Sequence, residues 1–454
     1  MKSDPRRRFV PLDLAGMCVS ERLGRLRGRF GEAGIDALLV TNLTNVSYLT
    51  GFTGTAGMVL VGPDSATLLT DGRYRTQSAE QLEVAGVVAD IEVGRPSQQR
   101  ESLARLARDF SRLGLEAEHV TWAMQRTLAK VLAGEDVDAA DSGGPSAEPT
   151  RAEPIPGRPE PIRAEPIRAE PIPGRPEPIR PEPIRAEPIR AEPIRAEPGS
   201  AEPGSAEPGP GPELVATSGL VAALRRVKDP GELARMQAAA AVADAALADV
   251  LGLLVAGVTE LELAAALDHQ MRLLGAQDRS FETIVASGPN AAKPHARPTD
   301  RPIGVGELVV VDFGAIIEGY CSDMTRTFCI GPPRSSVLAA VVEVVAAAQA
   351  AGVAAVAPGV EAVAVDRACR DVVASAGWSE AFMHGTGHGV GLEIHEPPSV
   401  GATSTDKLEE SSVVTVEPGV YLPGVGGARI EDTVVVTAGG ARALTCAPKV
   451  VVLG

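Results

Sequence analysis

The sequence has little of what characterises disulfide-linked, nucleic-acid-binding or membrane proteins. Its 454 residues include five scattered cysteines, an odd number with no CxxC pair. This spacing predicts neither a disulfide framework nor a cysteine-type zinc site, and it favours a reducing, cytoplasmic location. The formal net charge is −16. Because nucleic acids and anionic membrane surfaces attract basic patches, this balance argues against both as partners.

An uninterrupted apolar run long enough to cross a bilayer is also missing. The N-terminus is basic but has no apolar stretch of the signal-peptide kind. The longest apolar run, residues 337–357, is mainly Ala and Val and is interrupted by Glu343, Gln349 and Gly352. A glutamate is costly in hydrocarbon. We therefore predict an amphipathic helix packed on a sheet, and no membrane partner. The 44% of apolar residues is enough for large cores.

Composition divides the chain into three parts, of which the middle one, residues 134–212, is of low complexity. It repeats pentapeptides of Pro, Glu, Arg, Ala and Ile, such as Arg185-Ala-Glu-Pro-Ile. A proline at nearly every fifth position blocks helices and sheet ladders. We predict a disordered, extended linker without a core of its own. Its PxxP matches leave open docking to a proline-binding domain, although such a repeat produces them by chance.

The two flanking parts predict folded domains. Residues 1–133 alternate helices with strands, which indicates an α/β domain. The expected elements are helices at 22–33 and 100–112, strands at 37–40, 57–61 and 66–70, and a polar turn at 45–51. Residues 213–454 begin with helices, and Asp229 before Pro230 marks a helix start. Strands dominate from Glu307 onward. The predicted class is α+β, with helices packed on one side of a largely antiparallel sheet.

Two aspartates form the first candidate motif. Asp312 and Asp323 flank a predicted hairpin that turns near Gly319 and places Asp312 opposite Thr325. Asp323 is then a diagonal neighbour on the same face, with side chains roughly 6–8 Å apart. A buried, unpaired carboxylate is costly, and a shared cation would offset that cost. The alternative is a pair of salt-bridged aspartates, with Arg326 as the candidate partner.

A histidine cluster is the second motif. His384, His388 and His395 lie within twelve residues of one another, and His295 lies in the same half of the chain. His384 and His388 have the spacing of a helical zinc site, but alternate glycines from residue 385 to 391 make a helix improbable. They favour an irregular strand or loop with close backbone approach. A single histidine would be interpreted as structural, whereas three in one glycine-rich segment indicate a site.

Two glutamates complete the set. Glu417 and Glu431 each lie in a β-branched run, where a solvated charge is unexpected. With the two aspartates and one imidazole, they form a ligand set that suits Mn²⁺, Co²⁺ or Zn²⁺. Five such ligands, two of them bridging, would hold a pair of ions roughly 3.5 Å apart.

These motifs, in this order, resemble the pita-bread metallopeptidases: methionine aminopeptidase, aminopeptidase P and prolidase. The resemblance rests on the aspartate spacing, the HGTGHGVG stretch, Glu-Pro-Gly and Arg-Ile-Glu, and it covers residues 214–454. Residues 50–54 and 70–74 resemble the creatinase/prolidase N-terminal domain. The implied architecture is an N-terminal α/β domain, a linker and a C-terminal pita-bread catalytic domain.

The resemblance implies a role for each ligand. Asp312 is expected to bind one metal ion, Asp323 and Glu431 to bridge the pair, and His388 and Glu417 to bind the second. Two Mn²⁺ ions are expected, with Co²⁺ or Zn²⁺ as alternatives. Glu417 is the expected proton acceptor from a metal-bound water.

It also implies roles for residues around the metal ions. His295, His384 and His395 are expected to orient the scissile peptide and stabilise the tetrahedral intermediate. Arg429 is expected to support the carboxylates.

The implied substrate is a peptide with proline at the second position. We predict an Xaa-Pro aminopeptidase acting as a homodimer, because in relatives the N-terminal domain covers the site, often from a partner subunit. The alternatives are an Xaa-Pro dipeptidase (prolidase) and a non-catalytic binding protein of the same fold. The N-terminal domain argues against a methionine aminopeptidase. The linker departs from the short connection of relatives, and loop entropy permits it at small cost.

Overall fold

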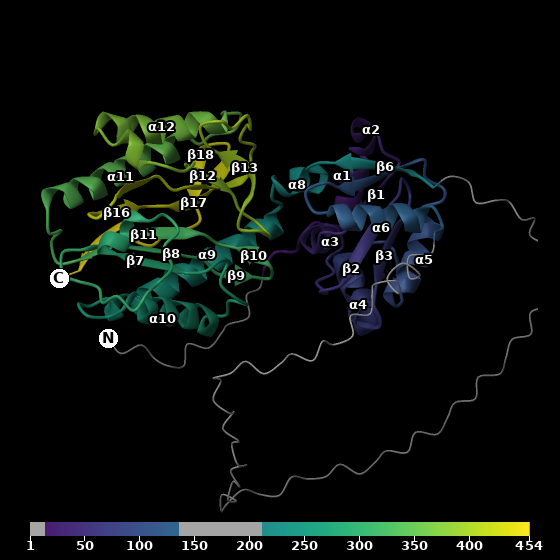
Figure 1. Ribbon diagram of the computed structural model, residues 1–454, viewed down its shortest axis with the longest axis horizontal. Helices are drawn as coiled ribbons and strands as arrows, with labels where there is room; N and C mark the ends of the chain where they lie inside the picture. The colour runs from purple at the N-terminus through teal and green to yellow at the C-terminus, as the bar shows by residue number, and fades with distance from the viewer. Residues whose placement is uncertain (1–13, 136–210, 454) are drawn as a thin grey trace, which may run out of the picture. The chain divides into compact units, whose positions relative to one another are not determined.

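The protein is described by a computed structural model over residues 14–135 and 211–453, excluding the side chains of Val450 and Val451 (Figure 1). The predicted linker lies almost entirely outside these described residues. Both flanking parts are folded, and the predicted mixture of helices and strands is confirmed.

The N-terminal part is built on a six-stranded mixed sheet in the order β4-β3-β2-β1-β5-β6. Its strands are β1 (Ala37–Val40), β2 (Gly57–Val61), β3 (Ala66–Thr70), β4 (Asp90–Val93), β5 (Arg112–Glu116) and β6 (Glu213–Thr217). β2 runs antiparallel to β1 and β3, and the other pairs are parallel. β6 follows the linker in sequence, so residues from both sides of it complete one sheet. Residues 213–217 therefore belong to the N-terminal sheet, although the C-terminal domain was predicted to begin at residue 213.

Helices cover both faces of this sheet, which explains why β1 is apolar throughout. Leu38 and Val40 point into one core, whereas Ala37 and Leu39 point into the other. The helices are α1 (Arg22–Arg27), α2 (Phe30–Ala33), α3 (Leu43–Thr50), α4 (Arg75–Ala85), α5 (Pro96–Leu106), α6 (Trp122–Leu132) and α8 (Leu220–Arg225).

Two local predictions in this part are corrected. The predicted helix at 22–33 is divided into α1 and α2. The predicted polar turn at 45–51 is helix α3, which begins where the Asn42 side chain accepts hydrogen bonds from the backbone N–H groups of Thr44 and Asn45. Gly51 ends it with a φ of 76°. Asn42 is a helix-capping residue type, so the signal for this helix was present in the sequence.

The C-terminal part contains two larger sheets. One has the order β19-β11-β8-β7 and the other β13-β12-β14-β17-β18. The first comprises β7 (Ile284–Ser287), β8 (Leu308–Phe313), β11 (Met324–Ile330) and β19 (Val450–Leu453). The second comprises β12 (Gly387–Gly389), β13 (Glu396–Val400), β14 (Val413–Val416), β17 (Asp432–Thr437) and β18 (Gly440–Ala443). Short ribbons pair β9 (Ile316–Ile317) with β10 (Tyr320–Cys321) and β15 (Gly419–Leu422) with β16 (Gly426–Arg429). Apart from β11 with β19, the named pairs are antiparallel.

Two pairs of helices lie on the outer sides of these sheets (Figure 1). α9 (Pro230–Val250) and α10 (Glu260–Leu273) pack on the first sheet, and α11 (Ser336–Ala355) and α12 (Ala362–Ser375) pack on the second. Asp229 caps α9 as predicted, through a hydrogen bond from the backbone N–H of Glu232. The predicted packing of helices on one side thus holds for each sheet, but there are two sheets, and the helices lie on both outer sides of the pair.

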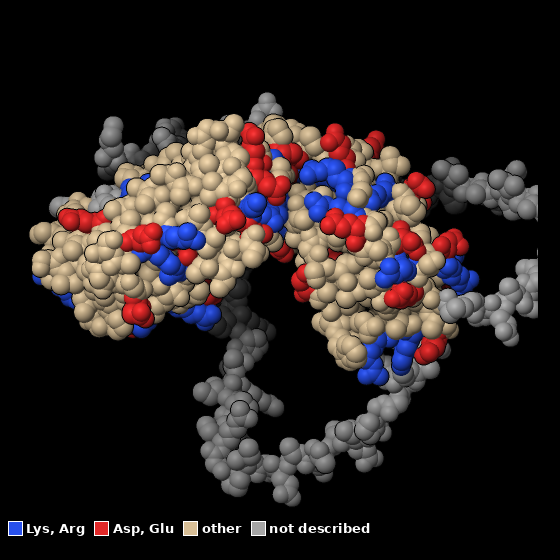
Figure 2. Space-filling model, turned by 90° about the horizontal axis from the view of Figure 1, so that it is seen from above, with Lys and Arg blue, Asp and Glu red and all other residues tan. Residues whose placement is uncertain are grey.

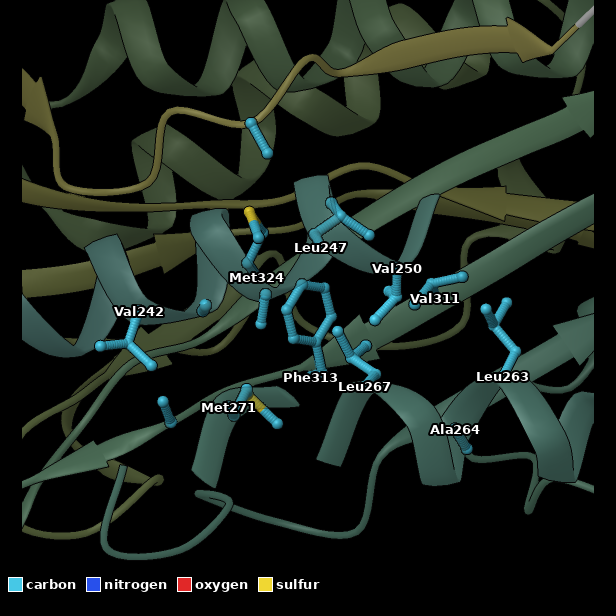
Figure 3. Packing of buried hydrophobic residues seen from close by; sticks show 14 of the residues in the cluster. Val242, Leu247, Val250, Leu263, Ala264, Leu267, Met271, Val311, Phe313 and Met324 are labelled. Atoms are coloured by element: carbon cyan, nitrogen blue, oxygen red, sulfur yellow. The ribbon is translucent and has the colours of Figure 1, made fainter. Parts of the chain in front are cut away.

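The core under α9 and α10 fixes which side chains of β8 face the other way. Val311 and Phe313 of β8 point into this core, where Phe313 lies among Leu247, Leu267 and Met271 (Figure 3). Side chains alternate along a strand, so Asp312 faces away from these helices. The apolar packing of its neighbours therefore directs this carboxylate toward the second sheet.

α9 and α11 are long and apolar enough to span a membrane by length and composition alone. Both also contribute residues to the cores described above, which is common for central helices. α11 is the predicted 337–357 helix and contains one charged residue, Glu343. Seen from above in Figure 2, the face over α11 and α12 is mostly uncharged.

Candidate metal centre

A cavity of about 670 Å³ lies in the C-terminal part, and every predicted site residue lines it. These residues are His295, Asp312, Asp323, His384, His388, His395, Glu417, Arg429 and Glu431. The carboxylates Asp312, Asp323 and Glu431 are buried, whereas His295 and His395 are exposed. The structure therefore brings together four sequence motifs that span more than a hundred residues.

Three carboxylates converge at the base of this cavity. One oxygen from each of Asp312, Asp323 and Glu431 lies within 4.8 Å of the others. Oδ1 of Asp312 and Oε1 of Glu431 are buried and have no hydrogen-bond partner among the described residues. Buried acceptors without a partner are rare and costly. Their convergence fits a cation held by this cluster.

The hairpin that carries the aspartates has the predicted register. β8 pairs with β11 so that Asp312 lies opposite Thr325, and Asp323 immediately precedes β11. The Thr325 hydroxyl donates to Oε2 of Glu431 at 2.7 Å, and the Glu431 N–H donates to the Thr325 carbonyl at 3.1 Å. Thr325 thus fixes the third carboxylate beside the two aspartates.

His388 and Glu417 form the other wall of the cluster. Nε2 of His388 lies 3.3 Å from Oε1 of Glu417 and 3.7 Å from Oδ2 of Asp323. Nδ1 of His388 lies 3.0 Å from the carbonyl of Gly389. A proton on Nδ1 would make that contact a hydrogen bond and leave Nε2 as a free lone pair for a metal ion.

The glycines around His388 permit the predicted close backbone approach. A Cβ at Gly387 would lie 2.1 Å from the carbonyl oxygen of Thr415, and one at Gly389 would lie 2.4 Å from that of Pro397. β12 can therefore pass between β13 and β14 only without side chains at these positions. The prediction that this segment is not a helix is confirmed.

Arg429, and not Arg326, pairs with an aspartate of the site. The Arg429 guanidinium donates to Oδ2 of Asp312, and its Nε lies 4.0 Å from Oε2 of Glu417. Arg326 is fully buried and pairs with Asp432 at 2.9 Å. The alternative in which Arg326 neutralises the aspartates is therefore wrong. Asp323 has no Arg or Lys ion pair among the described residues.

The histidines are held differently. Nε2 of His384 lies 2.9 Å from the Tyr421 hydroxyl, which accepts a hydrogen bond of 2.8 Å from Nη1 of Arg429. The His395 ring packs edge-on against that of His388, with centroids 4.4 Å apart. His295 lies on the loop after the short helix Gly288–Ala292.

Burial and like charges raise the pKa values of two of the clustered carboxyls. Burial is the main cause for both Asp323 and Glu431. Nearby carboxylates add to it: Glu431, Asp312 and Glu417 for Asp323, and Glu417 and Asp312 for Glu431. Burial also raises the pKa of Asp312, against the pull of Arg429. In the absence of a cation, the cluster therefore holds protons that a metal ion would displace.

Glu417 differs from the other carboxyls. Burial by itself would raise its pKa, but the hydrogen bond and positive charge of His388, with Arg429, bring that pKa below its usual value. Burial lowers the pKa of His384, and burial together with His388 lowers that of His395. Near pH 7 the site thus combines an ionised Glu417 with neutral imidazoles at His384 and His395. At His388, in contrast, burial lowers the pKa but Glu417 raises it above its usual value.

The roles of two residues at the site were not predicted from the sequence. Tyr421 connects His384 to Arg429, and Thr325 connects Glu431 to the aspartate hairpin. A signal for Tyr421 existed. It is one of only four tyrosines in the chain and lies four residues after Glu417.

Comparison with known proteins relates this site to a family. Residues 234–438 match metallopeptidase family M24, and residues 22–145 match the creatinase/prolidase N-terminal domain. An uncharacterized peptidase of Bacillus subtilis is 33% identical over 432 residues, which cover 95% of this chain and 99% of that protein. The Xaa-Pro dipeptidase of Pyrococcus furiosus is 40% identical over 222 residues, or 49% of this chain and 64% of that protein.

Solved structures agree over nearly the whole chain. The Xaa-Pro dipeptidase from Bacillus anthracis has a TM-score of 0.75 at 32% identity, covering 96% of this chain and 100% of that one. The X-Pro aminopeptidase from Thermotoga maritima has a TM-score of 0.69 at 28% identity, covering 92% and 98%. The predicted resemblance and fold class are confirmed.

Proposed function

The chain belongs to metallopeptidase family M24, and from this premise we propose that it hydrolyses the bond between an N-terminal residue and proline with two bound metal ions. The observation that carries the metal proposal is the buried cluster of Asp312, Asp323 and Glu431 with its two unpartnered oxygens. The proline preference is supported by the names of the relatives, which include Xaa-Pro dipeptidases and an X-Pro aminopeptidase.

The donor set fits two divalent cations. As the family resemblance implied, Asp312 would bind one ion, His388 and Glu417 would bind the other, and Asp323 and Glu431 would be shared by both. Mn²⁺ is the proposed ion, because carboxylates and one imidazole suit it well. When bound, such ions supply a Lewis acid and lower the pKa of a coordinated water.

Side chains of the site account for proton transfer and for stabilisation of the charge that develops on the substrate. Glu417 is ionised near neutral pH, so it can accept a proton from the attacking water. His395 is exposed in the cavity and neutral, so its N–H can donate to the scissile carbonyl as negative charge develops there. Arg429 remains charged, and its ion pair with Asp312 opposes the rise in the pKa of that carboxyl that burial causes.

The permitted substrate length has two candidates. The resemblance implied an aminopeptidase that accepts longer peptides, whereas Arg297 favours a dipeptidase. Arg297 lines the cavity, its side chain is 85% exposed, and it contacts Glu282, another lining residue, at 3.3 Å. Arg429, in contrast, is buried and engaged by Asp312. Arg297 is thus a cation that the free carboxylate of a dipeptide can reach.

Initial rates on matched peptides test the proposal. The metal-loaded enzyme is assayed with Ala-Pro, Ala-Pro-Ala, Ala-Ala and Ala-Ala-Ala. Cleavage of the proline peptides alone is the expected result. Cleavage of Ala-Pro but not Ala-Pro-Ala would identify a dipeptidase, and cleavage of the tripeptide an aminopeptidase. Equal rates on the alanine peptides would contradict the proline preference.

A further inference from the structure

An ion pair on α12 lies outside the residues that line the cavity, yet it contacts the segment that carries two of its histidines. Asp366 and Arg370 are one helical turn apart, and Nε of Arg370 donates to Oδ2 of Asp366 at 2.7 Å. Asp366 is 1% exposed. Such a buried carboxylate is retained only when its hydrogen bonds are satisfied.

Arg370 uses its remaining donors on the backbone around His384. Nη1 donates to the carbonyl of Phe382 at 3.1 Å, and Nη2 donates to the carbonyl of His384 at 2.5 Å. The guanidinium also lies over the Phe382 ring, 4.4 Å from its centroid. The planar guanidinium fork therefore contacts residues 382–384 at three points, through two hydrogen bonds and one ring contact. A lysine has the same charge but cannot reproduce this geometry.

Asp366 holds the other side of the same segment. Its Oδ1 accepts hydrogen bonds from the N–H of Thr386 at 3.1 Å and from the Thr386 hydroxyl at 2.9 Å. The carbonyl of Thr386 in turn accepts from the N–H of Glu417 at 2.7 Å. The ion pair thus fixes the backbone before and after Gly385.

The segment needs such an external support. Gly385 and Gly387 have no side chains that could pack it in place, and glycine adds conformational freedom. The His384 ring must nevertheless remain 2.9 Å from the Tyr421 hydroxyl. Shifts on the order of 1 Å at a reacting group cost roughly 100-fold in rate.

We propose that Asp366 and Arg370 are positioning residues that set the His384 imidazole at the reacting peptide, without touching substrate or metal ion. The inference deepens the proposed function and rests on it, together with the expectation that His384 orients the scissile peptide. It predicts that the pair acts through His384 and not through general stability.

A double-mutant cycle tests this dependence. In Arg370→Gln we expect kcat on Ala-Pro to fall roughly 10- to 100-fold, with KM changed less than about threefold. In the His384→Ala background, Arg370→Gln is expected to have no further effect. Arg370→Lys is expected to lose as much as Arg370→Gln, because the fork and not the charge is needed.

A second readout does not depend on activity. In metal-free protein labelled with ¹³C-histidine, Arg370→Gln is expected to shift or broaden the His384 ring signal and leave those of His119 and His269 unchanged. The matched control is Asp244→Asn, since Asp244 accepts two backbone N–H bonds of 2.8 Å, from Cys446 and Ala447, away from the cavity. The control is expected to preserve kcat and the His384 signal.

Four results would each overturn the inference. They are an unchanged kcat in Arg370→Gln, the same fold loss in the presence and absence of His384, an unaltered His384 signal, and full recovery in Arg370→Lys. Failure of the proposed function is distinguishable. A wild-type enzyme that does not cleave Ala-Pro would refute that function, while the spectrum would still report whether Arg370 positions His384.

Discussion

Replacing Asp323 with asparagine is predicted to have opposite effects on the metal-free and metal-loaded protein. Asp323 has carboxylate neighbours in Asp312 and Glu431, with one oxygen of each within 4.8 Å. Two unit charges at that distance repel by about 3.5 kcal/mol at an effective dielectric constant near 20. Asparagine keeps the shape of the side chain but removes the charge, so it relieves this repulsion.

Protonation already relieves part of the repulsion, because the pKa of Asp323 is well above its usual value. We therefore expect Asp323→Asn to stabilise the metal-free catalytic part by about 1–3 kcal/mol at pH 8. For a domain of this size, that raises Tm by roughly 2–12 °C. With free metal ion a thousandfold above Kd, the wild type gains about 4 kcal/mol from binding. The variant, without a bridging ligand, gains much less, so the order of the Tm values reverses.

Thermal unfolding in EDTA and in excess Mn²⁺ measures both effects, with Asp244→Asn as the matched control outside the cluster. The control is expected to show the same change of Tm in both buffers. A lower Tm of Asp323→Asn in EDTA would refute the argument about repulsion. An equal metal-induced gain in variant and wild type would refute the assignment of Asp323 as a ligand.

Three further predictions concern pH, substrate length and Tyr421. Because the folded-state pKa values of Asp323 and Glu431 are raised, the metal-free protein should lose their stabilising contribution as pH rises from about 4 through those values. The metal-induced gain in Tm should therefore grow between pH 4 and 8, and a constant gain would contradict this. Arg297→Gln should raise KM for Ala-Pro by up to roughly fivefold and leave KM for Ala-Pro amide unchanged; equal changes would exclude carboxylate recognition. Tyr421→Phe should lower the stability by about 1–3 kcal/mol, measured by urea unfolding, because Arg429 loses a buried acceptor; a neutral result would contradict that role.

The local geometry of the aspartate hairpin could be predicted from its turn and from the alternation of side chains along a strand. The turn near Gly319 placed Asp312 opposite Thr325, as the structure has it, and the period of two placed Asp323 on the same face as Thr325. The same alternation places Arg326 on the opposite face from Thr325, so the wrong choice of Arg326 as a partner was avoidable. The alternate glycines beside His388 likewise predicted the close backbone approach that the structure shows.

Contacts between distant segments could not be predicted in this way. β6 joins the N-terminal sheet although it follows the linker, and the local sequence of a strand does not indicate which strand it pairs with. The Asp366–Arg370 pair looks like an ordinary i,i+4 ion pair on a helix, and only the fold places it against residues 382–386. The sequence contains the N-cap residue of α3, but the polar composition of residues 45–51 favoured the prediction of a turn.

Metal stoichiometry measured together with activity tests the central claim most directly. Metal-free enzyme is titrated with Mn²⁺ by calorimetry while Ala-Pro hydrolysis is followed in parallel, for wild type and Asp323→Ala. The account predicts two bound ions per chain, activity that appears with them, and loss of both in the variant. Hydrolysis by metal-free enzyme, or wild-type binding and activity in Asp323→Ala, would contradict it.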